Sequence, residues 1–397
     1  MLESRDGRRV VVTGVGVVAP CGIGAADFWT GLATPVPPSV TREVPGFDPT
    51  TIGLSKVEVR RLDRFAQLAL VAADEAIGDA GLADESARDG ERTGVLIGCG
   101  IGGAWSWESQ VRLIDEKGPS RVSPLTVPMV MPNAAAGAVS MRWGLAGPCE
   151  TISTACATGT QSIGNAARWI AAGRVDTVVA GGTESCLTGV NLAGFGNMRA
   201  LSPTGVSRPF DTERDGFCAA EGAGILVLEE YSRAVARGAR IYAEIAGVGS
   251  GADAYHITAP APGGRGAARC MREALSDGGV APSDVTHINA HGTSTQLNDA
   301  GEADAIAAVF GGHRPAVTSI KGVTGHSLGG AGAIEAAALS LTFAHRSLPP
   351  TIGTTTVDPA LDIDVVLSPR DWEPAPALTN SFGFGGHNAT LLFTPVG

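Results

Sequence analysis

Short runs of apolar, β-branched residues alternate along the chain with segments whose apolar residues lie three and four positions apart. The runs are typical of buried strands, and the spaced segments indicate helices that pack on them. The predicted strands are residues 9–18, 94–100, 151–154, 175–180, 224–229, 285–290, 316–320 and 388–393. The predicted helices are residues 60–81, 157–173 and an Ala-rich helix that ends near Ala344, with residues 33–58, 104–133 and 195–224 largely irregular. This alternation predicts an α/β protein.

The second half of the chain repeats features of the first half in the same order. The resemblances pair residues 237–249 with 8–16, residues 273–280 with 75–82, and residues 316–344 with the strand and helix around Cys156. Such recurrence indicates two fused copies of one β-α-β-α unit. We therefore expect two halves, residues 1–235 and 236–397, whose equivalent helix N-termini meet at one central cleft.

Cys156 lies where the strand 151–154 is followed by the helix that starts at 157. A helix N-terminus has unpaired N–H groups and the positive end of the macrodipole, and both favour a thiolate. The small neighbours Ala155, Ala157 and Gly159 allow a substrate to come close. Because most buried cysteines only fill space, the nucleophile hypothesis depends on partners elsewhere in the chain.

Three polar, small-residue-rich segments end strands or begin helices and supply such partners: residues 289–295, 319–326 and 380–387. The first contains His291 and the second contains Lys321 and His326. A cysteine served by two histidines is suited to peptide hydrolysis, to thiolytic cleavage, or to acyl transfer with carbon–carbon bond formation.

Three other patterns imitate known sites. His287 and His291 are four residues apart, but on a strand their Cα atoms are about 13 Å apart, so they form no metal pair. Residues 325–329 match the hydrolase elbow GxSxG, yet residues 321–324 separate that serine from the preceding strand. Residues 14–19 fit a dinucleotide fingerprint in letters, but Pro20 follows where the phosphate-binding helix belongs. We expect neither a metal nor a nucleotide site.

Composition narrows the environment and the partners. The net charge of −11 disfavours binding to nucleic acid. The seven cysteines are scattered and never form CxxC, which indicates free thiols in a reducing compartment. No apolar run approaches the roughly 18 residues of a membrane span. We expect a soluble, cytoplasmic protein that binds no membrane.

Four ordered motifs resemble those of the β-ketoacyl-acyl carrier protein synthases, in the elongating type with a Cys-His-His site. The motifs are Thr154–Gly159, Asn289–Thr295, Lys321–His326 and Asn380–Asn388, and the resemblance covers essentially the whole chain. It implies a thiolase-like fold of two duplicated βαβαβαββ halves in five α-β-α-β-α layers. It also implies an acyl carrier protein as partner, a homodimer or a heterodimer with a chain-length-factor-like homologue, and no cofactor beyond the carrier's phosphopantetheine.

The resemblance implies catalytic roles for five side chains. Cys156 would be the nucleophile that takes the acyl chain as a thioester. His291 and His326 would donate hydrogen bonds to the malonyl thioester carbonyl and stabilise the enolate formed when CO₂ leaves. Lys321 and Glu335 would hold this network in place electrostatically.

Further roles concern the substrate. Thr293 and Thr295 would bind the pantetheine arm. Phe384 would gate the acyl pocket, and its backbone N–H would form the oxyanion hole with that of Cys156. Trp107, with Trp105, would bound the far end of the acyl pocket near the dimer partner.

An acidic synthase needs a local basic site to dock an acidic carrier protein. Arg60, Arg61 and Arg64, on one predicted helical stretch, are candidates for that site, although an ordinary solvated helix face explains them as well.

The expected reaction is the decarboxylative Claisen condensation of an acyl thioester with malonyl-acyl carrier protein. Asn298 and Asp299, after the His291 motif, resemble polyketide synthases more than housekeeping fatty-acid synthases, so the resemblance implies type II polyketide biosynthesis, with housekeeping fatty-acid elongation as the alternative. A thiolase would need a second catalytic cysteine near the C-terminus, whereas Cys270 is the last one. A non-catalytic partner subunit would lack Cys156.

Overall fold

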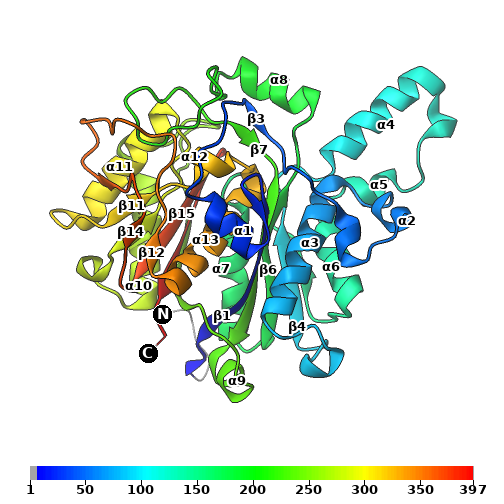
Figure 1. Ribbon diagram of the computed structural model, residues 1–397, viewed down its shortest axis with the longest axis horizontal. Coiled ribbons are helices and arrows are strands. Elements are labelled where there is room, and N and C mark those ends of the chain that lie inside the picture. Colours follow the sequence, from blue (N-terminus) through cyan, green and yellow to red (C-terminus); the bar gives the residue numbers. More distant parts are fainter. Residues whose placement is uncertain (1–6, 397) are drawn as a thin grey trace.

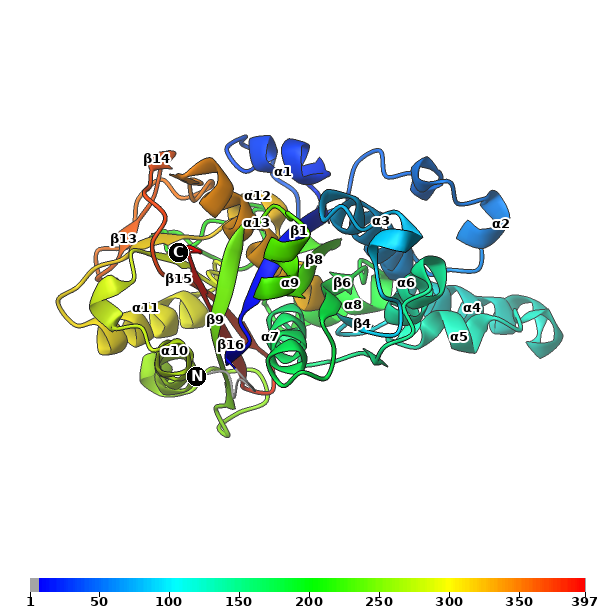
Figure 2. The same ribbon diagram turned by 90° about the horizontal axis from the view of Figure 1, so that it is seen from below.

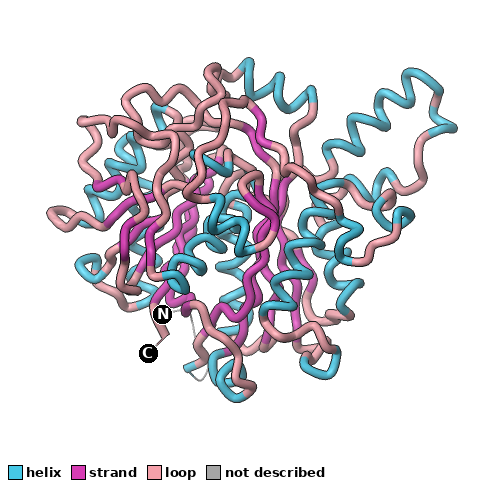
Figure 3. The backbone as a smooth tube through the Cα atoms, in the orientation of Figure 1, coloured by secondary structure: helices cyan, strands magenta, loops and turns pink. Residues whose placement is uncertain are grey.

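A computed structural model describes residues 7–396 of the chain (Figures 1 and 3). One large mixed sheet of 12 strands runs through the molecule. Its strands lie in the order β13-β11-β10-β15-β16-β9-β1-β8-β6-β4-β5, with β2 (Gly22–Ile23) paired to β1. The other strands of the sheet are β1 (Val10–Ala19), β4 (Thr93–Gly98), β5 (Cys149–Glu150), β6 (Thr177–Glu184), β8 (Gly222–Glu230), β9 (Ala243–Ala252), β10 (His287–Asn289), β11 (Ala316–Thr318), β13 (Asp364–Val365), β15 (Ala377–Gly383) and β16 (His387–Thr394). Two small sheets pair β3 (Thr41–Arg42) with β7 (Ala219–Ala220) and β12 (Ser347–Leu348) with β14 (Arg370–Asp371).

The large sheet consists of two halves with the same strand order. With the two-residue strand β2 left aside, β1-β8-β6-β4-β5 are, from the junction outward, the first, fifth, fourth, second and third strands that the N-terminal half gives to the large sheet. The strands β9-β16-β15-β10-β11 repeat that order in the C-terminal half, and β13 extends it. β1 and β9 pair at the junction, where Val11 lies opposite Glu244. The predicted duplication is confirmed, whereas the boundary at residue 235 stays a prediction.

The helices complete five layers (Figure 2). α3 (Arg64–Asp79) and α6 (Ala134–Trp143) cover the outer face of the N-terminal half, and α10 (Arg265–Gly278) and α11 (Gln296–Phe310) cover that of the C-terminal half. α7 (Thr158–Ala171) and α13 (Ala331–His345) lie between the two half-sheets. The remaining α-helices are α1 (Ala25–Gly31), α2 (Lys56–Val59), α4 (Ala104–Lys117), α5 (Thr126–Val130), α8 (Gly189–Asn197), α9 (Tyr231–Ala236) and α12 (Lys321–Thr324).

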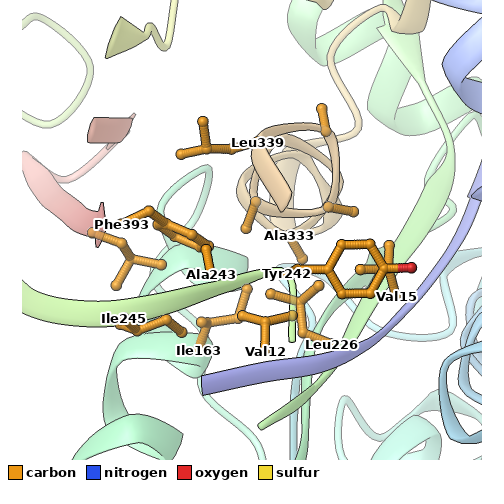
Figure 4. Close-up of a cluster of buried hydrophobic side chains, with 14 of the residues drawn as sticks. Val12, Val15, Ile163, Leu226, Tyr242, Ala243, Ile245, Ala333, Leu339 and Phe393 are labelled. Atoms are coloured by element: carbon orange, nitrogen blue, oxygen red, sulfur yellow. The ribbon is translucent and has the colours of Figure 1, made fainter. Parts of the chain in front are cut away.

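The two central helices are buried because their small side chains allow close packing. Residues 331–343 of α13 are all buried. A Cβ added at Gly159 of α7 would lie 2.5 Å from the backbone nitrogen of Ala333, so the helices nearly touch there. Figure 4 shows Ala333 and Leu339 of α13 among side chains of β1, β8, β9, β16 and α7. Both helix N-termini are thereby held at the centre of the molecule.

Glycines in β1 explain the apparent dinucleotide fingerprint. A Cβ at Gly14 would lie 2.1 Å from the carbonyl oxygen of Ala76, and one at Gly16 would lie 1.9 Å from that of Ala72. α3 therefore packs directly on the backbone of β1, which only glycine permits at these positions. The motif serves packing.

Three predicted elements differ from the structure. Residues 104–133 are largely helical, because Trp107, Val111 and Ile114 follow helical spacing on α4 although their side chains are exposed. The strand predicted at residues 151–154 is found at Cys149–Glu150. The predicted helix 60–81 is shorter and starts at Arg64, because the side chain of Asp63 caps α3.

All seven cysteines are free thiols, as their spacing predicts. Within residues 7–396, no helix has both the length and the apolar character needed to cross a bilayer.

Candidate active site

The site lies where parallel strands end. β4 and β5 run parallel, as do β10, β11 and β15, so their carboxyl ends meet at common edges. Cys156 follows β5 and His291 follows β10, while His326 follows β11 and α12. The sulfur and one ring nitrogen of each histidine all lie within 4.8 Å of one another. The two halves of the duplicated fold thus bring a thiol and two imidazoles together.

A tight turn presents Cys156. Ala155 adopts φ 50°, a left-handed conformation that costs energy for any residue but glycine. The N–H of Thr154 donates to Oγ1 of Thr158 at 2.8 Å and closes the turn at the start of α7. Such local strain is typical of functional sites, and here it places Cys156 directly before Ala157, the N-cap of the buried helix α7.

The hairpin turn between β15 and β16 covers the nucleophile. A Cβ added at Gly383 would lie 2.9 Å from the backbone nitrogen of Cys156. The N–H of Phe384 is directed at the sulfur and lowers the pKa of the thiol. Backbone N–H groups of both predicted oxyanion-hole residues therefore lie beside the reacting atom.

Burial has a larger effect on the thiol than any neighbouring charge. It raises the pKa of Cys156, whereas the ammonium of Lys321 and the N–H of Phe384 lower it. Burial thus opposes the thiolate that the helix N-terminus favours. Nε2 of His326 lies 3.1 Å from Sγ, within hydrogen-bonding distance.

A buried ammonium organises the first histidine. Nζ of Lys321 donates to the carbonyl oxygen of His291 at 2.6 Å and lies 3.3 Å from its Nδ1. It also forms an ion pair with Glu335. Burial raises the pKa of Glu335 to about 7, although Lys321 acts against that rise. The predicted pair of Lys321 and Glu335 is thus in place, directly behind His291.

Both imidazoles are neutral at pH 7. Burial, followed by the ammonium of Lys321, lowers the pKa of His291 and of His326 well below 6.5. The His326 ring packs edge-on against Phe217, with ring centroids 5.1 Å apart, and against His291, 5.3 Å apart. A neutral imidazole offers one N–H donor and one acceptor.

Two buried carboxylates that support the site were not predicted from the sequence. Glu302 of α11 accepts the N–H groups of His291 and Gly292, each at 2.9 Å. Glu184, at the end of β6, accepts those of Gly100 and Ile101. Glu184 is a lone acidic residue in an apolar stretch, which was an available signal, whereas Glu302 lies between Asp299 and Asp304 and does not stand out. The distant partners of either residue cannot be found from local pattern.

A cavity of about 320 Å³ opens onto the three central residues. Its wall includes Thr293, Thr295 and Phe384, so the structure brings these predicted substrate-binding residues to the nucleophile. The hydroxyl oxygens of Thr293 and Thr295 are 3.0 Å apart. Cys156 is the one cysteine among the described residues that line the cavity. Its wall also includes Met198, Phe217, Leu297, Asn298, Leu328 and Phe382.

Trp107 does not reach this cavity. Its side chain is 58% exposed on α4 and lines a separate hollow with Val111 and Val190. Nε1 of Trp105 donates to Oγ of Ser185 at 3.1 Å. Ala104, at the start of α4, does pack in one apolar cluster with Cys156. A role for the two tryptophans at the far end of an acyl pocket stays a prediction.

The three arginines of the predicted docking site do not share one helical stretch. Arg60 and Arg61 are exposed in the turn after α2, whereas Arg64 begins α3. Arg64 donates to both carboxylate oxygens of Glu221, at 2.7 and 2.5 Å. Glu221 is itself buried, so the guanidinium of Arg64 is already engaged within the fold.

A thiol with two neutral imidazoles, between the halves of a duplicated α/β fold, defines a thiolase-like condensing enzyme. Residues 37–234 match the β-ketoacyl synthase N-terminal domain and residues 242–355 match the β-ketoacyl synthase C-terminal domain. The chain therefore belongs to the β-ketoacyl synthase family. The predicted family, the fold and the acyl-transferring condensing activity are confirmed.

The chain is similar both to a 3-oxoacyl-[acyl-carrier-protein] synthase and to ketosynthases of known structure. A 3-oxoacyl-[acyl-carrier-protein] synthase 2 of Synechocystis sp. is 45% identical, over 99% of this chain and 99% of its own. The structure of the ishigamide ketosynthase/chain length factor has a TM-score of 0.92 at 34% identity, over 98% of this chain and 100% of its own. A ketosynthase bound to the hexaketide, in complex with its type II polyketide acyl carrier protein, has a TM-score of 0.90 at 34% identity over the same shares.

Proposed function

We propose that Cys156 accepts an acyl chain from a carrier-protein thioester and that the bound chain then condenses with malonyl-acyl carrier protein. In the first step the thiol sulfur bonds to the acyl carbon and the carrier thiol leaves with the proton. In the second, malonyl loses CO₂, its α-carbon attacks the acyl carbon, and the sulfur of Cys156 leaves. The close approach of one sulfur and two neutral imidazoles, all within 4.8 Å, carries this proposal.

The histidines stabilise the enolate formed when CO₂ leaves. Two N–H donors in a buried cleft are suited to a thioester oxygen that becomes negative, because fixed donors need no reorganisation there. Nε2 of His291 and of His326 serve as these donors. Lys321, paired with Glu335, holds the His291 ring, and neither residue touches substrate.

Backbone groups stabilise the other oxyanion. The N–H groups of Cys156 and Phe384 donate to the acyl carbonyl oxygen as the acyl carbon becomes tetrahedral at each step. Phe384 gates the pocket, since Gly385 and Gly386 beside it adopt φ of 83° and 74° and permit a range of backbone conformations. Thr293 and Thr295 bind the pantetheine arm, and the reaction needs no metal or bound cofactor.

A second subunit covers the apolar face of α4 and α5. Large apolar side chains cluster there with high exposure, and such a patch on a folded protein marks an interaction surface. Its occupant is a copy of this chain or a chain-length-factor-like homologue, which would place Trp107 at the subunit boundary. The exposed side chains are Ile101, Trp105, Trp107, Val111, Ile114, Leu125, Val127 and Met131.

We assign the enzyme to type II polyketide biosynthesis. The likeness to two polyketide ketosynthase structures over 98% of this chain supports that assignment. The second candidate is fatty-acid elongation, favoured by the higher identity of 45% to a 3-oxoacyl-[acyl-carrier-protein] synthase 2. In either pathway a cytoplasmic location is the predicted one.

The test incubates the protein with acyl- and malonyl-carrier protein and follows masses of intact proteins, beside Cys156→Ala. Acylation at Cys156 and a β-ketoacyl product two carbons longer, both absent in the variant, support the proposal. Wild-type protein that never loads contradicts it. Loading without extension points to a missing partner subunit. Extension of unsaturated or β-keto chains favours the polyketide pathway, and extension of saturated chains alone favours fatty-acid elongation.

A further inference from the structure

Arg42 is a buried cation that has no carboxylate partner within residues 7–396. Its side chain is 7% exposed, and it enters no ion pair among the described residues. Nη1 donates to the carbonyl oxygen of Val323 at 3.1 Å, and Nη2 lies 3.9 Å from Sγ of Cys218. Nε has no hydrogen-bond partner in the part of the chain that the structure describes. Because burying a guanidinium in this way is costly, its contacts deserve a functional explanation.

The backbone around Arg42 is connected to that of His326 through one intermediate strand. β3 pairs in parallel with β7, so that Arg42 lies opposite Ala220. On the other side of β7, Ala219 forms a parallel bridge with His326. The N–H of His326 donates to the carbonyl oxygen of Cys218 at 2.8 Å, and the carbonyl oxygen of His326 accepts the N–H of Ala220 at 3.0 Å. Three backbone segments thus form a small ribbon: β3, β7 and the segment at His326.

The side chain of Arg42 crosses the ribbon and contacts the same segment directly. Its stem packs against Gly325, where an added Cβ would lie 3.0 Å from Cδ of Arg42. Its guanidinium donates to the carbonyl oxygen of Val323, which belongs to the short helix α12 that begins at Lys321. Gly325 has a φ of 67°, so the chain turns sharply between this helix and His326. Arg42 therefore holds the whole connection between Lys321 and His326.

We infer that Arg42 is a positioning residue for His326. It keeps the short helix and the glycine turn in one arrangement, and so keeps Nε2 of His326 at 3.1 Å from the sulfur of Cys156. Displacement of a reacting group by about 1 Å costs roughly 100-fold in rate. As a statement about turnover, the inference rests on the proposed condensation.

A cavity beside Arg42 makes the inference open to chemical rescue. It has a volume of about 210 Å³, and its wall includes Arg42, Val206, Gly322 and Thr351. If Arg42 is truncated to alanine, a guanidinium ion can enter this space and bind the carbonyl oxygen of Val323. A neutral molecule of the same shape, such as urea, lacks the charge.

The test compares Arg42→Met, Arg42→Lys and Arg42→Ala with Arg272→Ala, which removes an exposed arginine of α10. We expect kcat for condensation to fall roughly 10- to 100-fold in Arg42→Met, with KM for malonyl-carrier protein within about twofold of wild type. Arg42→Lys should recover part of the rate. Guanidinium at about 20 mM should restore at least several-fold in Arg42→Ala, whereas urea, and either additive on Arg272→Ala, should not.

A second readout does not depend on turnover. Alkylation of Cys156 by iodoacetamide is followed against pH, because a displaced His326 no longer donates its Nε2–H to the thiolate and so no longer stabilises it. The pH of half-maximal rate should rise by about half a unit in Arg42→Met and return towards wild type in guanidinium-treated Arg42→Ala. Wild-type kcat and an unchanged alkylation profile in Arg42→Met would overturn the inference.

The two proposals fail separately. If the wild type does not condense, the proposed function fails, and the alkylation profile still decides the role of Arg42. If the wild type condenses and the Arg42 variants lose only thermal stability, with kcat unchanged and no response to guanidinium, Arg42 merely packs. Arg42→Met keeps the length of the stem, so it serves where Arg42→Ala does not fold.

Discussion

Nζ of Lys321 lies 3.3 Å from Nδ1 of His291, and this contact fixes the tautomer of the ring. An ammonium has three donors and no acceptor, so Nδ1 must accept and the ring proton resides on Nε2. Nε2–H is therefore the donor that faces the cavity. Lys321 thus determines which ring nitrogen of His291 carries the proton and can donate it towards the cavity.

Lys321→Met tests this dependence. The variant leaves Glu335 buried without its cation, which we expect to cost about 3–5 kcal/mol in the free energy of unfolding. Decarboxylation of malonyl-carrier protein should slow at least tenfold, because the His291 tautomer is no longer fixed. Urea unfolding and CO₂ release are measured.

The double variant Lys321→Met/Glu335→Gln separates charge from position. It removes the stranded carboxylate and should be more stable than Lys321→Met while decarboxylation stays slow. If the single and double variants were equally stable, the loss of stability in Lys321→Met would not come from the uncompensated carboxylate of Glu335.

Gly159→Ala tests the close contact of the two central helices. A Cβ there would meet the backbone nitrogen of Ala333 at 2.5 Å, so we expect a loss of about 2 kcal/mol or more in unfolding free energy. Gly194→Ala is the matched control on α8. A Cβ there has no neighbour within 4 Å, and helix propensity should make it neutral or more stable by up to about 1 kcal/mol. A harmless Gly159→Ala would show that the helices can separate freely.

Asp176 should make stability depend on acid pH. Its hydrogen bonds to Arg92, and then those to Arg8, lower its pKa from 3.8 to about 2, although burial acts in the opposite direction. A lowered folded-state pKa gives stability that is present above about pH 4 and is lost as pH falls towards 2. Asp176→Asn should therefore cost about 2 kcal/mol at pH 7 and progressively less below pH 4.

Acid unfolding of the wild type, Asp176→Asn and the exposed control Asp304→Asn measures this dependence. A cost of Asp176→Asn that is the same at pH 2.5 and pH 7 would contradict an electrostatic origin.

Arg60→Glu/Arg61→Glu tests carrier docking. Two exposed arginines that contact an acidic carrier contribute up to about 1 kcal/mol each, so the apparent KM for carrier-bound substrate should rise roughly threefold to tenfold. Turnover of a small thioester should be unchanged. Arg272→Glu serves as the control, because Arg272 belongs to α10, which lies on the opposite side of the molecule from α2 in Figure 1. An unchanged KM would exclude the patch. Arg64 is left in place because its loss would strand the buried Glu221.

Local chemistry explains which features could be predicted from the sequence. The two halves repeat the same order of strands, and each motif combines glycines with the polar groups that end a strand, so the positions of Cys156, His291, Lys321 and His326 could be predicted. The position of each motif directly after its strand is enough for this prediction, because the carboxyl ends of neighbouring parallel strands lie at a common edge of the sheet.

Features that depend on distant partners could not be predicted. The apolar side chains of α4 are exposed, so their helical spacing did not mark a buried face by which the helix could be predicted. Arg64 and Glu221 are 157 residues apart, and Arg42 and Val323 are 281 apart, so neither pairing follows from local pattern. Burial raises the pKa of Cys156, and that effect depends on the folded surroundings and not on the neighbouring residues.

The division of the site between the two halves has a consequence for protein synthesis. Cys156 leaves the ribosome 170 residues before His326. Until the second half has folded, the thiol has neither imidazole beside it, and Phe384 is not yet in place to complete the oxyanion hole. An unfinished chain is therefore unable to trap acyl groups from the cellular pool, and only a completed molecule takes part in the chemistry.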